Sequence, residues 1–247
     1  MFEYIRYGEQ DGIVTILLDR PAKKNAITSQ MLSDLRTCWD MFDASQTARV
    51  AILGSALDDI FSAGADLTDP PPNFWSALPE FGFSTDKPII AAINGKSIGI
   101  AAVLTSMCDF CVMSEEAELI YPEAKIGVCK GAVTALVRRM PLRLANELMM
   151  LGDPISAQRA YNAGFVNRVA ARGQHMETAR ALARTLAANA PLVVEMLKRM
   201  SLEVVGTTAI QTFAQVSDAS SRVNDSQDAR DALVAFRNKT KPVFHRR

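Results

Sequence analysis

The chain has few histidines and cysteines, and this scarcity excludes several kinds of site. It holds 2 histidines and 4 cysteines in 247 residues. A Ser-His-Asp hydrolase or a histidine-ligated metal centre needs a histidine placed in the core. His175 opens a polar helical stretch and His245 lies in the C-terminal tail, so we expect both to be solvated. Cys108 and Cys111 match C-x-x-C, but no second ligand pair follows, so we expect buried thiols and no metal site.

The sequence also lacks net charge and long apolar runs. Lys and Arg total 27, as do Asp and Glu, so no basic excess indicates nucleic acid as a partner. No uninterrupted apolar window approaches the length that crosses a membrane. The N-terminal stretch carries acids where a secretory signal would carry basic residues. We therefore expect a cytoplasmic protein that binds neither nucleic acid nor membrane.

Apolar patterning predicts strands and helices in alternation over residues 1–170, and helices alone from Met176 onward. A loop is expected at 57–75, because Pro70–Pro72 forbid regular structure there. The expected strands cover 12–19, 49–55, 87–99, 109–114 and 117–122. The expected helices of the first part include 29–45, 100–108, 134–140 and 142–152.

Two glycine-containing turns stand out as places where a ligand could approach the backbone. The first is "FSAGADL" (61–67), whose small residues leave the backbone accessible. The second is "INGKSIGIAAVL" (93–104), in which Gly99 ends a turn and Ile100 opens a helix. The first N–H groups of a helix have no internal partner and carry the positive end of its dipole. One N–H from each turn would form an oxyanion hole, although local sequence alone favours a structural role for either turn.

The order of several segments resembles that of the enoyl-CoA hydratase/isomerase (crotonase) family over nearly the whole chain. The segments are "LDRPAKKNAIT", "FSAGADL", "INGKSIGIAAVL", "CDFCVMS", "YPEAKIG", "LGDPISAQRAYNAGFVNRV" and "AFRNKTKPVF". The resemblance implies an α/β fold with a crotonase-like (ββα)-repeat spiral core at 1–190. It implies a helical C-terminal trimerisation region at 191–247, and therefore a homotrimer or a dimer of trimers.

The resemblance also implies an acyl-CoA thioester as substrate, with its carbonyl bound by two backbone N–H groups. By position these belong to Ala65 and Ile100. Lys24 matches a basic residue that often meets CoA phosphates. The other positions that match substrate-binding segments are Ala63, Gly64, Asp66, Leu67 and Gly99. We expect no metal and no separate cofactor, since CoA enters as part of the substrate.

Hydratases of this family use two glutamates, and only one of the two positions is acidic here. The first position is Val103, and the second is Glu123. One glutamate suffices to move a proton from C2 to C4 of a 3-enoyl-CoA, so we expect a double-bond isomerase. A hydratase, a hydratase-lyase and a non-catalytic acyl-CoA-binding paralogue remain alternatives. Without the resemblance, Glu123 reads as a solvent-facing acid, or as a partner of Lys125 or Lys130.

Aromatic residues cluster in the segment between Leu67 and Lys87, which includes Phe74, Trp75 and Phe81. We expect this segment to wall the acyl pocket, and its bulk is compatible with a large acyl group. Tyr121 is expected either in the core or on the same wall.

Overall fold

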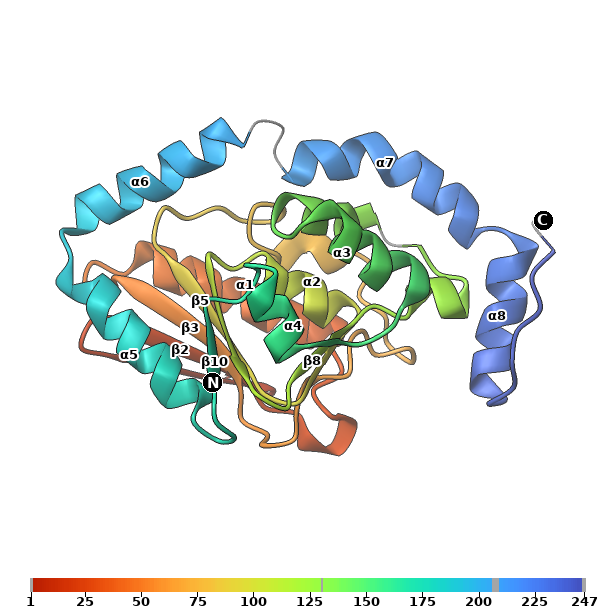
Figure 1. Ribbon diagram of the computed structural model, residues 1–247, viewed down its shortest axis with the longest axis horizontal. Coiled ribbons are helices and arrows are strands. Elements are labelled where there is room, and N and C mark those ends of the chain that lie inside the picture. Colours follow the sequence, from red (N-terminus) through yellow and green to blue (C-terminus); the bar gives the residue numbers. More distant parts are fainter. Residues whose placement is uncertain (1, 130, 206–208, 246–247) are drawn as a thin grey trace.

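Two sheets hold the strands in the computed structural model of this chain, which describes residues 2–129, 131–205 and 209–245. Figure 1 shows both sheets and the helices around them. The larger sheet has the order β1-β2-β3-β5-β7-β10. Its strands are β1 (Ile5–Gln10), β2 (Ile13–Leu18), β3 (Val50–Ser55), β5 (Ile89–Ile93), β7 (Phe110–Ser114) and β10 (Arg168–Ala170). The smaller sheet has the order β4-β6-β8-β9, with β4 (Ile60–Ser62), β6 (Lys96–Ile98), β8 (Glu118–Ile120) and β9 (Ile155–Ser156).

Three pairs of consecutive strands step from the larger sheet into the smaller one, and these steps generate the spiral. They are β3 to β4, β5 to β6 and β7 to β8. Neighbouring strands are parallel except in the pairs β1–β2 and β8–β9. The predicted α/β class with ββα repeats is thus confirmed.

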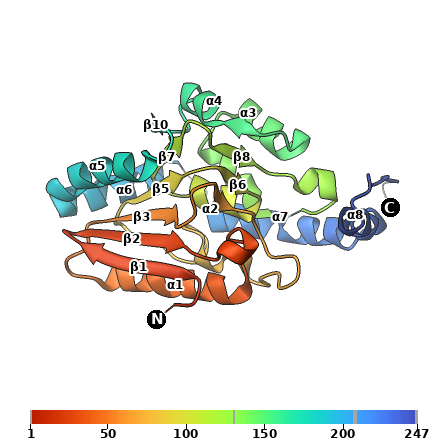
Figure 2. The ribbon, with the colours of Figure 1, turned by 90° about the horizontal axis from the view of Figure 1, so that it is seen from below.

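Helices cover both faces of the larger sheet, and Figure 2 shows α1 and α5 on different sides of it. On one face, α1 buries Trp39 and Phe42 completely. On the other, Ala179 and Ala183 of α5 pack against apolar side chains of β3, β5 and β7. The helices up to this point are α1 (Ser29–Ala44), α2 (Ile100–Ser106), α3 (Leu142–Asn146), α4 (Ala157–Asn162) and α5 (His175–Ala188).

Three further helices follow α5: α6 (Pro191–Val204), α7 (Ala209–Asn224) and α8 (Gln227–Arg237). In Figure 1, α6 and α7 run along one side of the molecule, and α8 stands at one end beside the C-terminus. α7 contacts the 3₁₀ helix η4 (Gly131–Arg138), and α8 contacts the 3₁₀ turn η3 (Glu123–Ile126). α6 begins at the predicted boundary between 190 and 191, and the trimerisation role of 191–247 stays a prediction.

The second step between sheets was missed by the sequence reading. Residues 87–99 were expected to form one strand, but the chain leaves β5 at Ile93 and enters β6 in the other sheet at Lys96. Gly95 makes this possible: its φ is +53°, and a Cβ there would lie 1.9 Å from the Asp59 carbonyl oxygen. The short strand β4 likewise occupies part of the expected loop at 57–75, and β1 had not been predicted.

Two helical expectations are also corrected in detail. Residues 142–152 form α3 followed by a π-helical turn, η5 (Glu147–Leu151), instead of one regular helix. Most of 134–140 belongs to the 3₁₀ helix η4. Sequence patterning detects an amphipathic helical stretch but not the hydrogen-bond spacing within it, which the packing determines.

His175 is buried, so the expectation that it is solvated was wrong. It is 8% exposed at the start of α5, where the helix packs onto the larger sheet, and burial lowers its pKa. Cys38, Cys108 and Cys111 are buried as expected, and Cys129 is half-buried. Within the described ranges, no cluster of three His, Cys, Asp or Glu side chains is arranged to hold a metal ion. Of the helices that the structure describes, none has the length and apolar character needed to cross a membrane.

Candidate active site

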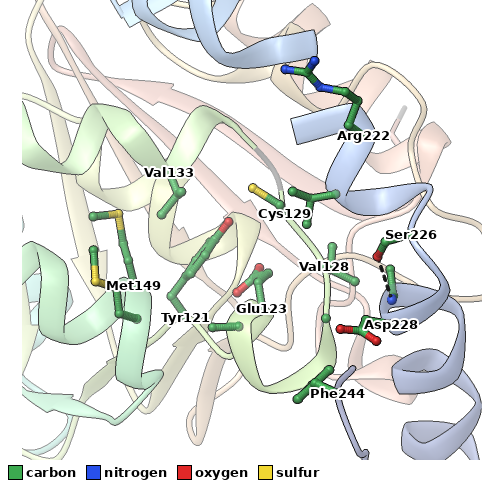
Figure 3. A pocket seen from close by; sticks show the side chains of 15 residues that line it. Tyr121, Glu123, Val128, Cys129, Val133, Met149, Arg222, Ser226, Asp228 and Phe244 are labelled. Atoms are coloured by element: carbon green, nitrogen blue, oxygen red, sulfur yellow. Dashed lines mark hydrogen bonds between the residues drawn. The ribbon is translucent and has the colours of Figure 1, made fainter. Parts of the chain in front are cut away.

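Glu123 is the first residue of η3, and Tyr121 and Pro122 separate it from the end of β8. Gly127 ends this 3₁₀ turn in the left-handed conformation, with φ of +66°. The N–H groups of Gly127 and Val128 both donate to the Glu123 carbonyl oxygen. These bonds fix the backbone of Glu123, whose side chain enters a cavity rather than the solvent (Figure 3).

The carboxylate of Glu123 lies directly over the turn that precedes α2. A Cβ on Gly99 would be 2.8 Å from Glu123 Oε1, which is closer than side-chain packing allows. Gly99 has φ of +59°, and its N–H donates to the Ile120 carbonyl oxygen at 2.8 Å. Only glycine therefore fits at this position beside the carboxylate.

Glu123 is half-buried as a residue, but its carboxylate has little compensation for its charge. The Oε2 atom is buried and has no hydrogen-bond partner within the described part of the chain. Burial raises the pKa of Glu123 to about 8. Lys125, which the sequence offered as a partner, instead bonds Asp153 at 2.8 Å and the Gly152 carbonyl at 3.0 Å. The solvent-facing reading of Glu123 is thus wrong, and Lys130 lies outside the described residues.

The first glycine turn contacts the second. Gly64 has φ of +91°, and a Cβ there would lie 2.8 Å from the Ile98 carbonyl oxygen and 3.9 Å from Gly99 Cα. Ala65 forms an isolated parallel bridge with Ile27. In this bridge Ile27 N–H bonds the Gly64 carbonyl and Asp66 N–H bonds the Ile27 carbonyl, so the N–H of Ala65 points away from Ile27.

Ile100 is the first residue of α2, so its N–H has no acceptor inside the helix. The structure therefore brings Ala65, Gly99, Ile100 and Glu123 into one neighbourhood, as the sequence predicted. Val103 lies one turn further along α2 and is 2% exposed. Its apolar side chain occupies the position that matches the first glutamate of the two-glutamate hydratases.

The segment that carries Lys24 is fastened to the first glycine turn. The Lys24 carbonyl accepts a hydrogen bond from Ala63 N–H at 2.9 Å, and its side chain is exposed. Leu67 is also exposed, at 46%. Both side chains are free to contact a ligand at the surface beside the two turns.

Asp66 has a structural role within its own loop. One carboxylate oxygen accepts hydrogen bonds from the N–H and the hydroxyl of Thr68, and the other pairs with Arg20 at 2.8 Å. These bonds hold the pKa of Asp66 well below its ordinary value. Both carboxylate oxygens are therefore engaged within the loop. The predicted contact of Asp66 with substrate stays a prediction.

Asn25 holds this region together, and the sequence reading had not singled it out. It is completely buried with φ of +54°. Its Nδ2 donates to the carbonyl oxygens of Leu18 and Phe61 and to Ser55 Oγ. Asparagine tolerates the left-handed conformation, and this is the one local signal. Two of its three partners, Ser55 and Phe61, lie 30 and 36 positions away in the sequence.

A cavity of about 860 Å³ opens beside Glu123, between η3 and the C-terminal helices. In Figure 3 the side chains of Tyr121 and Glu123 lie between Met149 on one side and Asp228 and Phe244 on the other. Most of the wall is apolar. The lining residues are Tyr121, Glu123, Ala124, Gly127, Val128, Cys129, Val133, Met149, Met150, Arg222, Val223, Ser226, Asp228, Ala229 and Phe244.

The aromatic segment at 67–87 does not line this cavity, and its role as a wall of the acyl pocket stays a prediction. It packs against α1 instead: the rings of Trp39 and Phe83 stack with centroids 5.1 Å apart, and Trp39 Nε1 donates to the Ala77 carbonyl oxygen. Part of the wall of this cavity comes from η5, α7 and α8, which no local pattern in the sequence connected with Glu123.

Known proteins resemble this chain along its full length. It is 32% identical over 260 residues to "Carnitinyl-CoA dehydratase" of Escherichia coli O157:H7, and 33% identical to that of Salmonella typhi, with 99% of both chains covered in each comparison. A solved carnitinyl-CoA dehydratase from Mycobacterium avium 104 superposes with a TM-score of 0.90 at 27% identity, covering 99% of each chain.

A family model described as Enoyl-CoA hydratase/isomerase matches residues 8–247. This range includes both glycine turns, Glu123 and the helices that wall the cavity. The chain therefore belongs to the enoyl-CoA hydratase/isomerase family.

Proposed function

We propose that this protein moves a proton between carbons of an acyl-CoA thioester, with Glu123 as the base, and that the reaction is double-bond isomerisation of an enoyl-CoA. The observation that carries the proposal is the buried carboxylate of Glu123 lying against the Gly99 turn. A single acid so placed suits removal and return of one proton.

A proton alpha to a thioester is too weakly acidic to be removed unless the enolate oxygen is stabilised as charge develops. The N–H groups of Ala65 and Ile100 are the proposed donors to that oxygen. Removing one such donor typically raises the barrier by about 3–4 kcal/mol. The dipole of α2 adds favourable potential at Ile100, although this helix is short.

The raised pKa of Glu123 makes it a stronger base than an ordinary carboxylate. In the proposed reaction its carboxylate takes a proton from C2 of a 3-enoyl-CoA, which gives the dienolate. The same group returns the proton to C4, and the double bond moves to C2–C3. The thioester oxygen gains and then loses negative charge while it accepts hydrogen bonds from the N–H groups of Ala65 and Ile100. The proposed reaction therefore requires no redox step and no separate cofactor.

A second carboxylate, Asp228, lines the same cavity but serves the C-terminal segment. Its Oδ1 accepts a hydrogen bond from the His245 N–H at 2.8 Å. Val103 supplies no acid on α2. The site therefore favours a reaction that one glutamate completes.

Water elimination or addition is the second candidate, because relatives at 32–33% identity are named carnitinyl-CoA dehydratase. In that reaction Glu123 would protonate the departing hydroxyl or deprotonate the attacking water. The missing acid at Val103 weighs against the two-acid route. A hydratase-lyase reaction would share these steps, and a non-catalytic acyl-CoA-binding role would share only the binding.

The CoA portion is proposed to lie across the exposed Lys24 side chain, with Ala63, Gly64 and Leu67 beside it. The chain is proposed to assemble as a homotrimer, alone or as a dimer of trimers. The support for assembly is α6, whose residues are all described and none of which is buried. Large apolar side chains on it are exposed: Leu192, Val193, Met196, Leu197, Met200 and Val204.

A thioester panel tests the proposal. The purified protein is given a 3-enoyl-CoA, a 2-enoyl-CoA and carnitinyl-CoA, and products are separated by chromatography. Isomerisation of the 3-enoyl-CoA as the fastest reaction supports the first candidate, and faster water elimination or addition supports the second. If calorimetry shows that thioesters bind but none is turned over, only the non-catalytic acyl-CoA-binding role would be supported.

A further inference from the structure

The turn that carries Glu123 is held by elements from the other end of the chain. Within the turn, Gly127 and Val128 bond the Glu123 carbonyl oxygen, so movement of these residues moves Glu123 directly. The next residue, Cys129, and the turn's final residue, Gly127, each contact a C-terminal helix.

Asn224, the last residue of α7, makes two hydrogen bonds to the backbone of Cys129. The Cys129 N–H donates to Asn224 Oδ1 at 2.8 Å, and Asn224 Nδ2 donates to the Cys129 carbonyl oxygen at 2.7 Å. The side-chain amide thus satisfies both polar groups of one backbone residue, as a neighbouring strand would. Both bonds are part-buried, and their loss would leave two backbone groups without these partners.

α8 approaches the same turn through small residues. A Cβ on Gly127 would lie 2.8 Å from the Cβ of Ala232 and 3.3 Å from the Cα of Ala229. Ala232 is 0% exposed and Ala229 is 3% exposed. The helix backbone therefore rests on the turn with no room for a larger side chain at either surface.

We propose that Asn224, together with the Ala229–Ala232 face of α8, positions Glu123 for proton transfer, so that the C-terminal helices set the geometry of the base. The inference rests on the proposed function, in which Glu123 is the base. Neither helix supplies a reacting group in this scheme. They act by fixing the turn, and a displacement of about 1 Å at a catalytic group can cost roughly 100-fold in rate.

The same contacts close the cavity beside Glu123, because Cys129 and Ala229 belong to its wall. Loosening them would admit water and lower the pKa of Glu123 toward its ordinary value. The other titratable groups of this wall are Tyr121, Cys129, Arg222 and Asp228, and Lys125 on the turn itself pairs with Asp153. The variants below replace none of these groups.

The experiment compares Asn224→Ala and Ala232→Leu with Asn189→Ala, an exposed asparagine at the end of α5. For the first two we expect kcat to fall about 10- to 100-fold with KM changed less than about threefold. We also expect the rise of activity with pH to move to lower pH. Asn189→Ala should match the wild type in all three quantities.

Cys129 supplies a readout that is independent of turnover. Its Sγ lies 3.6 Å from Ser220 Oγ, and the other three cysteines are buried. Loss of the two Asn224–Cys129 hydrogen bonds should make Cys129 react faster with a thiol reagent than it does in the wild type or in Asn189→Ala. Faster modification of Cys129 with unchanged kcat and pH profile would overturn the inference, because the Asn224 hydrogen bonds would then only hold α7 against the core.

Two controls separate the possible failures. If Ala232→Leu does not fold, Asn224→Ala alone decides, because it removes atoms and adds none. If Glu123→Gln retains turnover, the proposed function itself has failed. If Glu123→Gln loses turnover while Asn224→Ala keeps wild-type kcat and pH profile, only the positioning inference has failed.

Discussion

Glu123 Oε1 occupies the space that a side chain on Gly99 would need, with 2.8 Å between that oxygen and the position of a Gly99 Cβ. The base and the start of α2 are therefore in direct contact. Glycine at 99 serves two purposes, because it permits φ of +59° and leaves room for the carboxylate.

Gly99→Ala should displace the Glu123 carboxylate and reduce kcat by about 100-fold. Its matched control is Gly173→Ala, at φ of +75°, where an added Cβ would meet nothing within 4 Å. Both variants place an alanine at positive φ, which costs about 1–2 kcal/mol of stability at Gly173. The cost is larger at Gly99, where ψ is −122° and the new Cβ meets Glu123. Steady-state kinetics should show a rate loss at Gly99 alone, and thermal melts should show that both variants are folded at the assay temperature. Equal rates in the two variants would show that the contact does not matter for turnover.

Activity should rise with pH through about 8, because Glu123 acts as a base only when ionised and its pKa is about 8. Below that pH, kcat/KM should fall about tenfold for each unit. The measurement is the pH profile of kcat/KM with a 3-enoyl-CoA, which reports the ionisation of the unliganded protein. A profile that stays flat from pH 6 to 9 would contradict a buried, neutral Glu123.

The same burial makes folding stability depend on pH in a defined direction. The pKa of Glu123 rises from 4.5 to about 8 on folding, so the folded state binds the proton more tightly between these values. Stability is then greatest below about 4.5 and is lost as pH rises through 8, where a buried charge must form. Glu123→Gln should therefore gain stability over the wild type by about 4 kcal/mol between pH 5 and pH 9, at about 1.4 kcal/mol per pKa unit. Urea unfolding at the two pH values checks this, and a constant difference would count against it.

Val103→Glu should add water-addition activity toward a 2-enoyl-CoA, because it places a second acid one turn along α2 from Gly99. Val103 is 2% exposed, so burying the new carboxylate should cost about 3 kcal/mol of stability. Val103→Gln provides the same shape without the acid. A folded Val103→Glu protein that hydrates no faster than Val103→Gln would show that the missing acid does not explain the reaction preference.

The double variant Leu197→Lys, Met200→Lys should separate the proposed trimer into monomers, because both side chains lie on the exposed apolar surface of α6, at 60% and 53% exposure. Thr185→Lys on the exposed face of α5 is the control. Light scattering after size-exclusion chromatography gives the mass. A wild-type monomer, or a double variant of unchanged mass, would contradict assembly through α6.

The sequence sufficed for the parts of the site that lie in contiguous segments. "FSAGADL", "INGKSIGIAAVL" and "YPEAKIG" each keep their residues together, and the structure brings Ala65, Ile100 and Glu123 into one neighbourhood. The ββα repeat was predicted from the family resemblance, whereas strand patterning alone merged β5 with β6 and missed β4.

Features that depend on distant packing could not be read from local patterns. The break at Gly95 becomes visible only when Asp59 lies beside it, and the burial of His175 depends on where α5 packs. The aromatic segment at 67–87 packs against α1, a contact that its local pattern did not indicate. The cavity wall from α7 and α8 lies nearly 100 positions from Glu123 in the sequence, as the Cys129–Asn224 separation of 95 shows.

The central claim is that the Glu123 carboxylate carries the proton, and Glu123→Gln tests it most directly. Glutamine keeps the size and the hydrogen-bonding capacity of the side chain but cannot accept a proton as a base. Conversion of a 3-enoyl-CoA to the 2-enoyl-CoA is followed at pH 8.5, about where Glu123 becomes mostly ionised. The account predicts a loss of kcat of about 1,000-fold or more with thioester binding retained. Turnover within tenfold of the wild type would contradict it.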